Sequence, residues 1–124
     1  MPEPKTRRIL LVDDNDLVRE FIQVLLEELG YTVHSAATGQ QAIEMFRFHP
    51  IDLALLDIQM PEMDGYTLCG ELRKCRMVPT IFMSAAQDVA YRHHATRVGA
   101  ADFLPKPFQL HDIAQSIQHA LQPA

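Results

Sequence analysis

An apolar segment that ends in a carboxylate is the feature of this chain that most constrains its fold. Ile51 to Leu56 is apolar except for Asp52, Asp57 closes the segment, and a Pro- and Gly-containing stretch follows. This pattern is typical of a buried parallel strand whose last residue emerges at a loop. Ligands bind at the carboxyl ends of strands in open α/β sheets, although a lone Asp there could equally cap a helix. The rest of the chain decides between these interpretations.

Four further strand-like segments alternate with five helical segments. The strand patterns cover residues 7–12, 31–36, 79–84 and 101–104, and the helical patterns cover residues 17–29, 38–48, 64–74, 88–98 and 110–121. Apolar residues recur at three- and four-residue spacing from Leu17 to Leu29, which predicts a helix with an apolar stripe. The alternation predicts an α/β fold with a parallel sheet, right-handed crossovers and helices on both faces. We expect one domain over residues 1–124, with its core at residues 7–121.

The composition argues against several classes of protein. Of the 124 residues, 48% are hydrophobic and 22% are charged, which is ordinary for one globular domain. The net charge of −5 argues against direct binding of nucleic acid, and no apolar run approaches the ~20 residues of a membrane span. Because the first eight residues lack the apolar core of a signal peptide, we expect a cytoplasmic location with Cys69 and Cys75 as reduced thiols. The basic cluster Arg73, Lys74 and Arg76 is expected to be a solvated helix end.

Polar side chains leave the carboxyl ends of four of the expected strands. Asp13 and Asp14 follow the first strand, and Asp57 ends the third. Ser84 ends the fourth strand, and Lys106 follows the fifth by way of a loop that two prolines keep from being helical. Since the carboxyl ends of parallel strands meet at one edge of the sheet, these five side chains can converge in one pocket.

Such a pocket has a consistent chemistry. Two unit charges ~4 Å apart repel by about 4 kcal/mol at an effective dielectric constant near 20, so three carboxylates need protonation or a cation. Mg²⁺ suits them, because it prefers oxygen ligands and binds one or two carboxylates together with water and phosphate oxygens. One carboxylate could act as a nucleophile toward phosphorus, while Lys106 and Ser84 hold the phosphoryl oxygens.

The residues that carry these groups form a recognisable set. Val12-Asp13-Asp14, the segment Leu56 to Gly65, Met83-Ser84-Ala85 and Lys106-Pro107-Phe108 resemble, in this order and spacing, the signature of response-regulator receiver domains. The resemblance covers about residues 7–121. It implies a flavodoxin-like, doubly wound sheet of five parallel strands in the order 2-1-3-4-5 with five helices.

The resemblance also implies roles for individual residues. Asp57 would accept a phosphoryl group from a histidine kinase phosphohistidine, a phosphotransfer protein or a small phosphodonor. Asp14 and Asp57 would ligate Mg²⁺ directly with the backbone carbonyl of Gln59, and Asp13 would act largely through water. Ser84 and Lys106 would bind the phosphoryl group. Phe103 would be the aromatic residue that rotates inward on activation, coupled to Ser84.

The last part of the chain, from Asp102 onward, departs from the pattern of many receivers. Receivers that drive DNA-binding domains often dimerise through charged pairs on the fourth helix, fifth strand and fifth helix. Asp102 fits that pattern, but no Lys or Arg follows Lys106. We therefore expect a monomer or a different dimer. The downstream partner would be a protein target or an output domain absent from this chain, which is either a stand-alone receiver or part of a larger regulator or hybrid kinase.

Three functions of different classes fit these residues. The first is a phosphorylation-controlled signalling switch, which would not be a turnover enzyme. The second is a constitutive interaction module that keeps the fold without being phosphorylated; the clustered carboxylates count against it, because they would lower stability without purpose. The third is a Mg²⁺-dependent hydrolase with an Asp nucleophile. The sequence offers this hydrolase neither a separate general acid nor an insertion long enough to cover a substrate.

Overall fold

A computed structural model describes residues 6–85 and 89–122 of the chain. Strands and helices alternate along it, as the sequence predicts. The strands are β1 (Arg8–Val12), β2 (Thr32–Ala36), β3 (Leu53–Asp57), β4 (Thr80–Ser84) and β5 (Asp102–Pro105). The helices are α1 (Asp16–Glu28), α2 (Gly39–Phe48), α3 (Gly65–Arg73), α4 (Val89–Arg97) and α5 (Leu110–Leu121). The strands form one parallel sheet in the order β2-β1-β3-β4-β5, which confirms the predicted flavodoxin-like topology.

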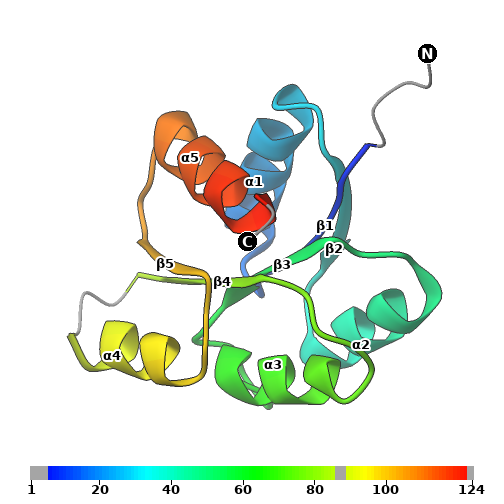
Figure 1. Ribbon diagram of the computed structural model, residues 1–124, viewed down its shortest axis with the longest axis vertical. Coiled ribbons are helices and arrows are strands. Elements are labelled where there is room, and N and C mark those ends of the chain that lie inside the picture. The colour runs from blue at the N-terminus through cyan, green and yellow to red at the C-terminus, as the bar shows by residue number, and fades with distance from the viewer. Residues whose placement is uncertain (1–5, 86–88, 123–124) are drawn as a thin grey trace.

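Helices cover both faces of the sheet. Figure 1 shows α1 and α5 on one face and α2, α3 and α4 on the other. Every residue of β3 and β4 is buried, because their side chains point alternately into two separate apolar cores. One core includes Ile22 and Ile117 from α1 and α5, and the other includes Phe46 and Leu68 from α2 and α3. Strands that are covered on both faces need apolar residues at successive positions, which is why β1 and β3 lack the alternation of a half-exposed strand.

Local signals fix where the helices begin and end. The side chains of Asn15, Thr38 and Asp64 accept hydrogen bonds from the backbone N–H groups three residues later, and so cap α1, α2 and α3. Gly30 follows the last turn of α1 with a φ of 95°, a left-handed conformation that glycine adopts without strain. α1 thus begins three residues after Asp13, whereas a seven-residue loop separates Asp57 from the beginning of α3.

The apolar stripe of α1 is wider than the face that the helix buries. Ile22 and Leu26 are buried, but Leu17, Phe21 and Val24 are 78%, 59% and 53% exposed. Positions 17, 21 and 24 are four and three residues apart, so they lie on one side of the helix. The exposed side chains of α1 thus form an apolar ridge on the surface.

The basic cluster at the end of α3 was expected to be solvated, and that expectation was wrong for Arg73 and Arg76, although Lys74 is exposed. Arg76 donates hydrogen bonds to the carbonyl oxygens of Phe46 and His49 at 2.9 and 2.7 Å, and its guanidinium group lies 4.0 Å from the centre of the Phe46 ring. Arg73 donates to the carbonyl oxygen of Val98. Cations at carboxyl-terminal helix ends satisfy carbonyls that have no partner within the helix.

Three smaller observations complete the description of the fold. Pro105 is the last residue of β5 rather than part of the following loop. Cys69 and Cys75 are both free thiols, the first buried and the second exposed. Among the helices of the described residues, none is long and apolar enough to cross a membrane.

Candidate functional site

Three carboxylates gather where β1 and β3 end. Asp13 and Asp14 directly follow β1, and Asp57 is the last residue of the neighbouring strand β3. One carboxylate oxygen from each of the three residues lies within 4.8 Å of the others. Asp13 is completely buried and Asp57 is 5% exposed, whereas Asp14 faces solvent. The structure therefore brings the three predicted acidic residues together into a cluster with one open side.

Lys106 supplies the cation of this cluster. Its Nζ lies 2.7 Å from Asp13 Oδ2 and 3.5 Å from Asp57 Oδ2. Its backbone N–H donates to the carbonyl oxygen of Ser84 at 2.8 Å, which extends the β4–β5 pairing by one residue beyond Pro105. The loop after β5 is thereby held against the end of β4, and the lysine side chain is held against the end of β1.

The two remaining predicted pocket residues lie beside the cluster. Ser84 is the last residue of β4 and is completely buried. Gln59 lies two residues after Asp57, and its backbone N–H donates to Asp57 Oδ1 at 3.4 Å. All six residues predicted for the phosphoryl and metal chemistry thus come from the carboxyl ends of β1, β3, β4 and β5 or from the loops that follow them.

Phe103 lies further along the sheet. It is 8% exposed and belongs to the core between the sheet and α2, α3 and α4. The guanidinium carbon of Arg92 in α4 lies 5.2 Å from the centre of its ring. In this structure the ring is already turned inward and packed, and its role as a switch stays a prediction.

The surroundings of Asp57 make its carboxyl group harder to ionise than a free one. Burial raises the pKa of this carboxyl group, the positive charge of Lys106 opposes that rise, and the negative charge of Asp13 adds to it, so that the pKa reaches about 6. The N–H group of Gln59 also opposes the rise. A carboxylate that is costly to ionise in the free protein gains from any cation that enters the cluster, which makes the pocket receptive to a metal ion.

Gly65 lets the loop after Asp57 close tightly. A methyl group at this position would lie 2.4 Å from the Asp57 carbonyl oxygen, well inside van der Waals contact. The backbone N–H of Gly65 donates to the carbonyl oxygen of Ile58 at 2.9 Å. The first residue of α3 therefore packs directly on the backbone at the end of β3, and any side chain there would displace the loop.

The donor set fits a hard divalent cation. Carboxylate oxygens are among the ligands that Mg²⁺ prefers, and one oxygen from each of Asp13, Asp14 and Asp57 lies within 4.8 Å of the others. The single positive charge of Lys106 cannot balance three carboxylates, so the cluster keeps an excess of negative charge when all three are ionised. This imbalance favours an additional cation.

Several residues of the site were not singled out from the sequence. Arg19 donates to the Asp13 backbone carbonyl at 2.9 Å, and the Asn15 backbone N–H donates to Asp13 Oδ1 at 2.9 Å. Tyr91 of α4 accepts a hydrogen bond from the Gln59 side chain at 3.2 Å. Asn15 could have been found as the cap of α1, but a contact between residues 32 positions apart leaves no signal in one sequence.

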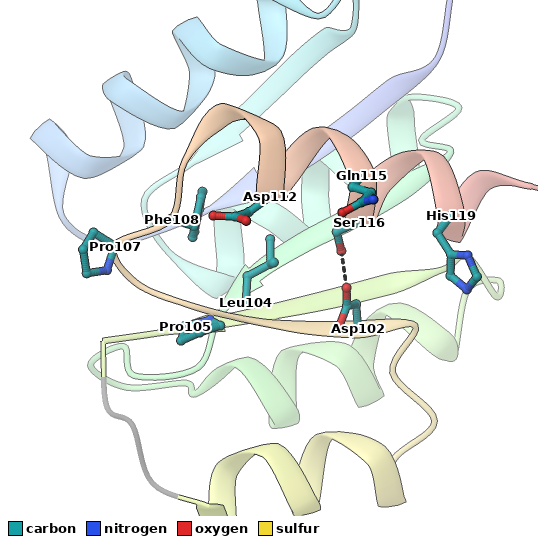
Figure 2. A pocket seen from close by; sticks show the side chains of 9 residues that line it. All are labelled: Asp102, Leu104, Pro105, Pro107, Phe108, Asp112, Gln115, Ser116 and His119. Atoms are coloured by element: carbon teal, nitrogen blue, oxygen red, sulfur yellow. Dashed lines mark hydrogen bonds between the residues drawn. The ribbon is translucent and has the colours of Figure 1, made fainter.

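Two surface grooves lie near the site. The first, of about 450 Å³, is almost entirely apolar; it runs between α1 and the loop after β5 and is lined by Leu17, Phe21, Lys106 and Phe108, among others. The second, of about 530 Å³, lies between β5 and α5 (Figure 2). In it Asp102 accepts a hydrogen bond from Ser116 Oγ at 2.6 Å. Lys106 borders both the first groove and the acidic cluster.

Comparisons with known proteins identify the family of this chain. The chain matches the family of response regulator receiver domains over residues 9–118. A probable transcriptional regulator, ycf27, of Cyanidium caldarium is 37% identical over 118 residues, which are 95% of this chain and 47% of that protein. The chain spans about half the length of the curated relatives it matches first.

Solved structures show the same fold. The chemotaxis protein CheY4 of Vibrio cholerae aligns with a TM-score of 0.88 at 25% identity, over 94% of this chain and 100% of that one. The receiver domain of a sensor histidine kinase of Pseudomonas aeruginosa, solved with a magnesium ion coordinated in its active site cleft, aligns with a TM-score of 0.84 at 32% identity, over 94% and 98% of the two chains. The chain therefore belongs to the response regulator receiver domains of two-component systems, which confirms the resemblance seen in its motifs.

Proposed function

We propose that this receiver domain is a Mg²⁺-dependent switch in which Asp57 accepts a phosphoryl group from a phosphohistidine. The observation that carries the proposal is the position of Asp57 within reach of both a second carboxylate and an ammonium group. Asp57 Oδ2 lies 3.5 Å from Lys106 Nζ, which also pairs with Asp13, at the carboxyl end of the central strand β3. This arrangement offers a nucleophile, a metal site and a fixed cation in one place.

The reaction is a single displacement at phosphorus. A carboxylate oxygen of Asp57 forms a bond to phosphorus as the bond from phosphorus to the donor imidazole nitrogen breaks, and the electron pair of that bond stays on nitrogen. Lys106 exchanges part of its contact with Asp57 for a phosphoryl oxygen, and Ser84 donates its hydroxyl hydrogen to another. Charge stabilisation and positioning are the main contributions of a protein to phosphoryl transfer, and these residues supply both.

Mg²⁺ is the cofactor that the acidic cluster suits. Asp14 and Asp57 would hold it directly with the Gln59 backbone carbonyl, and Asp13 would act largely through water. When bound, the ion neutralises charge on the phosphoryl oxygens. The solved receiver that carries a coordinated magnesium ion, at 32% identity, supports this assignment.

The phosphodonor protein would dock on the apolar groove between α1 and Phe108. The exposed ridge of Leu17 and Phe21 borders this groove, and so does Lys106 of the acceptor site. A helix of the donor that places apolar side chains there would bring a histidine on the same helix next to Asp57. Exposed apolar ridges beside a catalytic pocket are typical of binding surfaces for protein partners.

The output is the binding of a protein target, or of an output domain outside this chain, to the surface around Phe103. Arg92, which lies over the Phe103 ring, places α4 at that surface. The chain would then be a switch and not a turnover enzyme, since its product is the altered protein itself.

Intact mass after incubation with acetyl phosphate and Mg²⁺ tests the proposal. We expect the mass of one phosphoryl group to be added to the wild-type chain, and none to Asp57→Ala or in the presence of EDTA. Absence of both adduct and Mg²⁺ binding would favour a constitutive interaction module. Sustained turnover of generic phosphate esters would favour a hydrolase.

A further inference from the structure

The loop that follows Asp57 is tied to α4 through one side-chain pair. Gln59 uses two groups at once: its backbone N–H donates to Asp57 Oδ1 at 3.4 Å, and its side-chain Nε2 donates to the Tyr91 hydroxyl oxygen at 3.2 Å. Tyr91 belongs to α4, 32 residues further along the chain. Gln59 therefore contacts both the acceptor carboxylate and this helix.

The helix that carries Tyr91 buries little of its surface. Ala95 is buried, and the other described side chains of α4 are half-buried or exposed. From α3, the Tyr66 hydroxyl donates to the backbone carbonyl of Tyr91 at 2.7 Å, and the Tyr66 ring lies 4.2 Å from the His94 ring. Because burial holds such a helix weakly, its polar contacts decide a large part of its position. Of the hydroxyl groups of Tyr66 and Tyr91, only that of Tyr91 is hydrogen-bonded to Gln59 in the loop after Asp57.

We propose that Tyr91 is a positioning residue for the acceptor site. Its hydroxyl group holds the side chain of Gln59, and the backbone of Gln59 carries both the N–H that contacts Asp57 and the carbonyl assigned to Mg²⁺. Fixing one end of Gln59 restricts the motion of the loop that presents this carbonyl. The expected effect on Mg²⁺ binding rests on the function proposed above. The contact between Gln59 and Tyr91 does not depend on that function.

The same contact couples the state of Asp57 to α4. Conversion of the carboxylate into an acyl phosphate moves its negative charge outward, which changes the bond that the Gln59 N–H makes to Oδ1. The Gln59 side chain passes that change to Tyr91. Coupling between two sites is reciprocal, so a partner that shifts Tyr91 by binding α4 also changes the affinity of the acceptor site for its metal.

A double-mutant cycle with a matched control tests this positioning role. Tyr91→Phe removes the hydroxyl and keeps the ring, Gln59→Ala removes the side-chain amide and keeps the backbone, and Tyr66→Phe removes the other hydroxyl that holds α4. Calorimetric titration gives the Mg²⁺ dissociation constant of each variant and of the Gln59→Ala/Tyr91→Phe pair. We expect Tyr91→Phe and Gln59→Ala each to weaken Mg²⁺ binding about two- to tenfold, the range for one neutral hydrogen bond. The pair should be no weaker than either variant alone, and Tyr66→Phe, which keeps the Tyr91 hydroxyl, should weaken Mg²⁺ binding less than Tyr91→Phe does.

Three results would overturn the inference. They are a wild-type dissociation constant for Tyr91→Phe, an equal loss in Tyr66→Phe, and additive losses in the pair. Amide hydrogen exchange of α4 in the metal-free protein separates this failure from that of the proposed function. Equal, non-additive loss of protection in Gln59→Ala and Tyr91→Phe would support the coupling even if the chain takes up no phosphoryl group, and additive loss would refute it.

Discussion

The ammonium group of Lys106 lies 2.7 Å from Asp13 Oδ2, although 93 residues separate the two in the chain. Its distance to Asp57 Oδ2 is longer, at 3.5 Å. In the free protein, then, Lys106 pairs more closely with the fully buried carboxylate than with the proposed acceptor. This leaves Asp57 only partly compensated, and the lysine is available to an incoming phosphoryl oxygen.

Replacement of Lys106 by Met should have opposite effects on metal binding and on phosphorylation. Loss of the competing cation should tighten Mg²⁺ binding about fivefold, which corresponds to the ~1 kcal/mol of a partly exposed ion pair. Phosphoryl uptake from acetyl phosphate should slow roughly 10- to 100-fold, since a preorganised cation is lost. Lys74→Met, which removes an exposed lysine paired with Glu71 on α3, should change neither quantity. Weaker Mg²⁺ binding in Lys106→Met would contradict this account.

The raised pKa of Asp57 predicts how stability depends on pH. In the folded state the pKa is about 6, above the ordinary value of 3.8, so between pH 4 and 6 the folded state binds more protons than the unfolded state. The contribution of Asp57 to stability therefore falls as pH rises through this window.

Asp57→Asn removes this contribution. Without Mg²⁺, the variant should be more stable than the wild type above pH 6, by on the order of 1 kcal/mol after screening by solvent, and the difference should shrink toward pH 4. Urea unfolding in the presence of EDTA at several pH values measures it. A difference that stays constant from pH 4 to 8 would mean that the pKa of Asp57 is not raised.

Two glycines of α3 should respond to alanine in opposite directions. Gly65→Ala places a methyl group against the Asp57 carbonyl oxygen and should lower the free energy of unfolding by about 1–3 kcal/mol. Gly70 is exposed within the same helix and an added methyl group meets nothing within 4 Å, so Gly70→Ala should raise it by about 0.5–1 kcal/mol. Denaturant unfolding of both variants checks this. A Gly65→Ala protein as stable as the wild type would show that the loop after Asp57 yields easily.

The ridge on α1 should matter for a protein phosphodonor and not for a small one. Phe21→Ala removes an aromatic side chain that is already 59% exposed, so the fold should tolerate it. Transfer from the phosphohistidine protein that phosphorylates the wild type fastest should slow about tenfold or more, as for an aromatic residue central to an interface. The rate with acetyl phosphate should not change. Phe48→Ala changes an exposed side chain at the last residue of α2 and should leave both rates unchanged. Equal rates in Phe21→Ala and the wild type would place donor docking elsewhere.

The positions of the site residues were predictable because strands in a parallel sheet present their ends at one edge. Asp13, Asp57 and Ser84 terminate or follow apolar segments, and the loop prolines placed Lys106. Their proximity, though not their distances, follows from that topology. The chemical roles of these residues, the oligomeric state and the cytoplasmic location stay predictions.

Features that depend on packing geometry were not predictable. The spacing of apolar residues gives the period of α1 but not the width of the face it buries, so the exposure of Phe21 could not be anticipated. Arg76 was expected in solvent because its long-range partners, the backbone carbonyls at the end of α2, have no sequence signature. The contact between Gln59 and Tyr91 is of the same kind.

The most direct test of the central claim is to locate the acyl phosphate chemically. Borohydride reduces an acyl phosphate of aspartate to homoserine. Phosphorylation with acetyl phosphate and Mg²⁺, followed by reduction, trypsin digestion and sequencing of the peptides 9–19 and 48–73 by mass spectrometry, therefore identifies the modified residue among Asp13, Asp14 and Asp57. We predict homoserine at position 57, and its absence when Mg²⁺ is removed. Homoserine at position 13 or 14, or an unmodified Asp57 in a protein that has gained one phosphoryl group, would contradict the account.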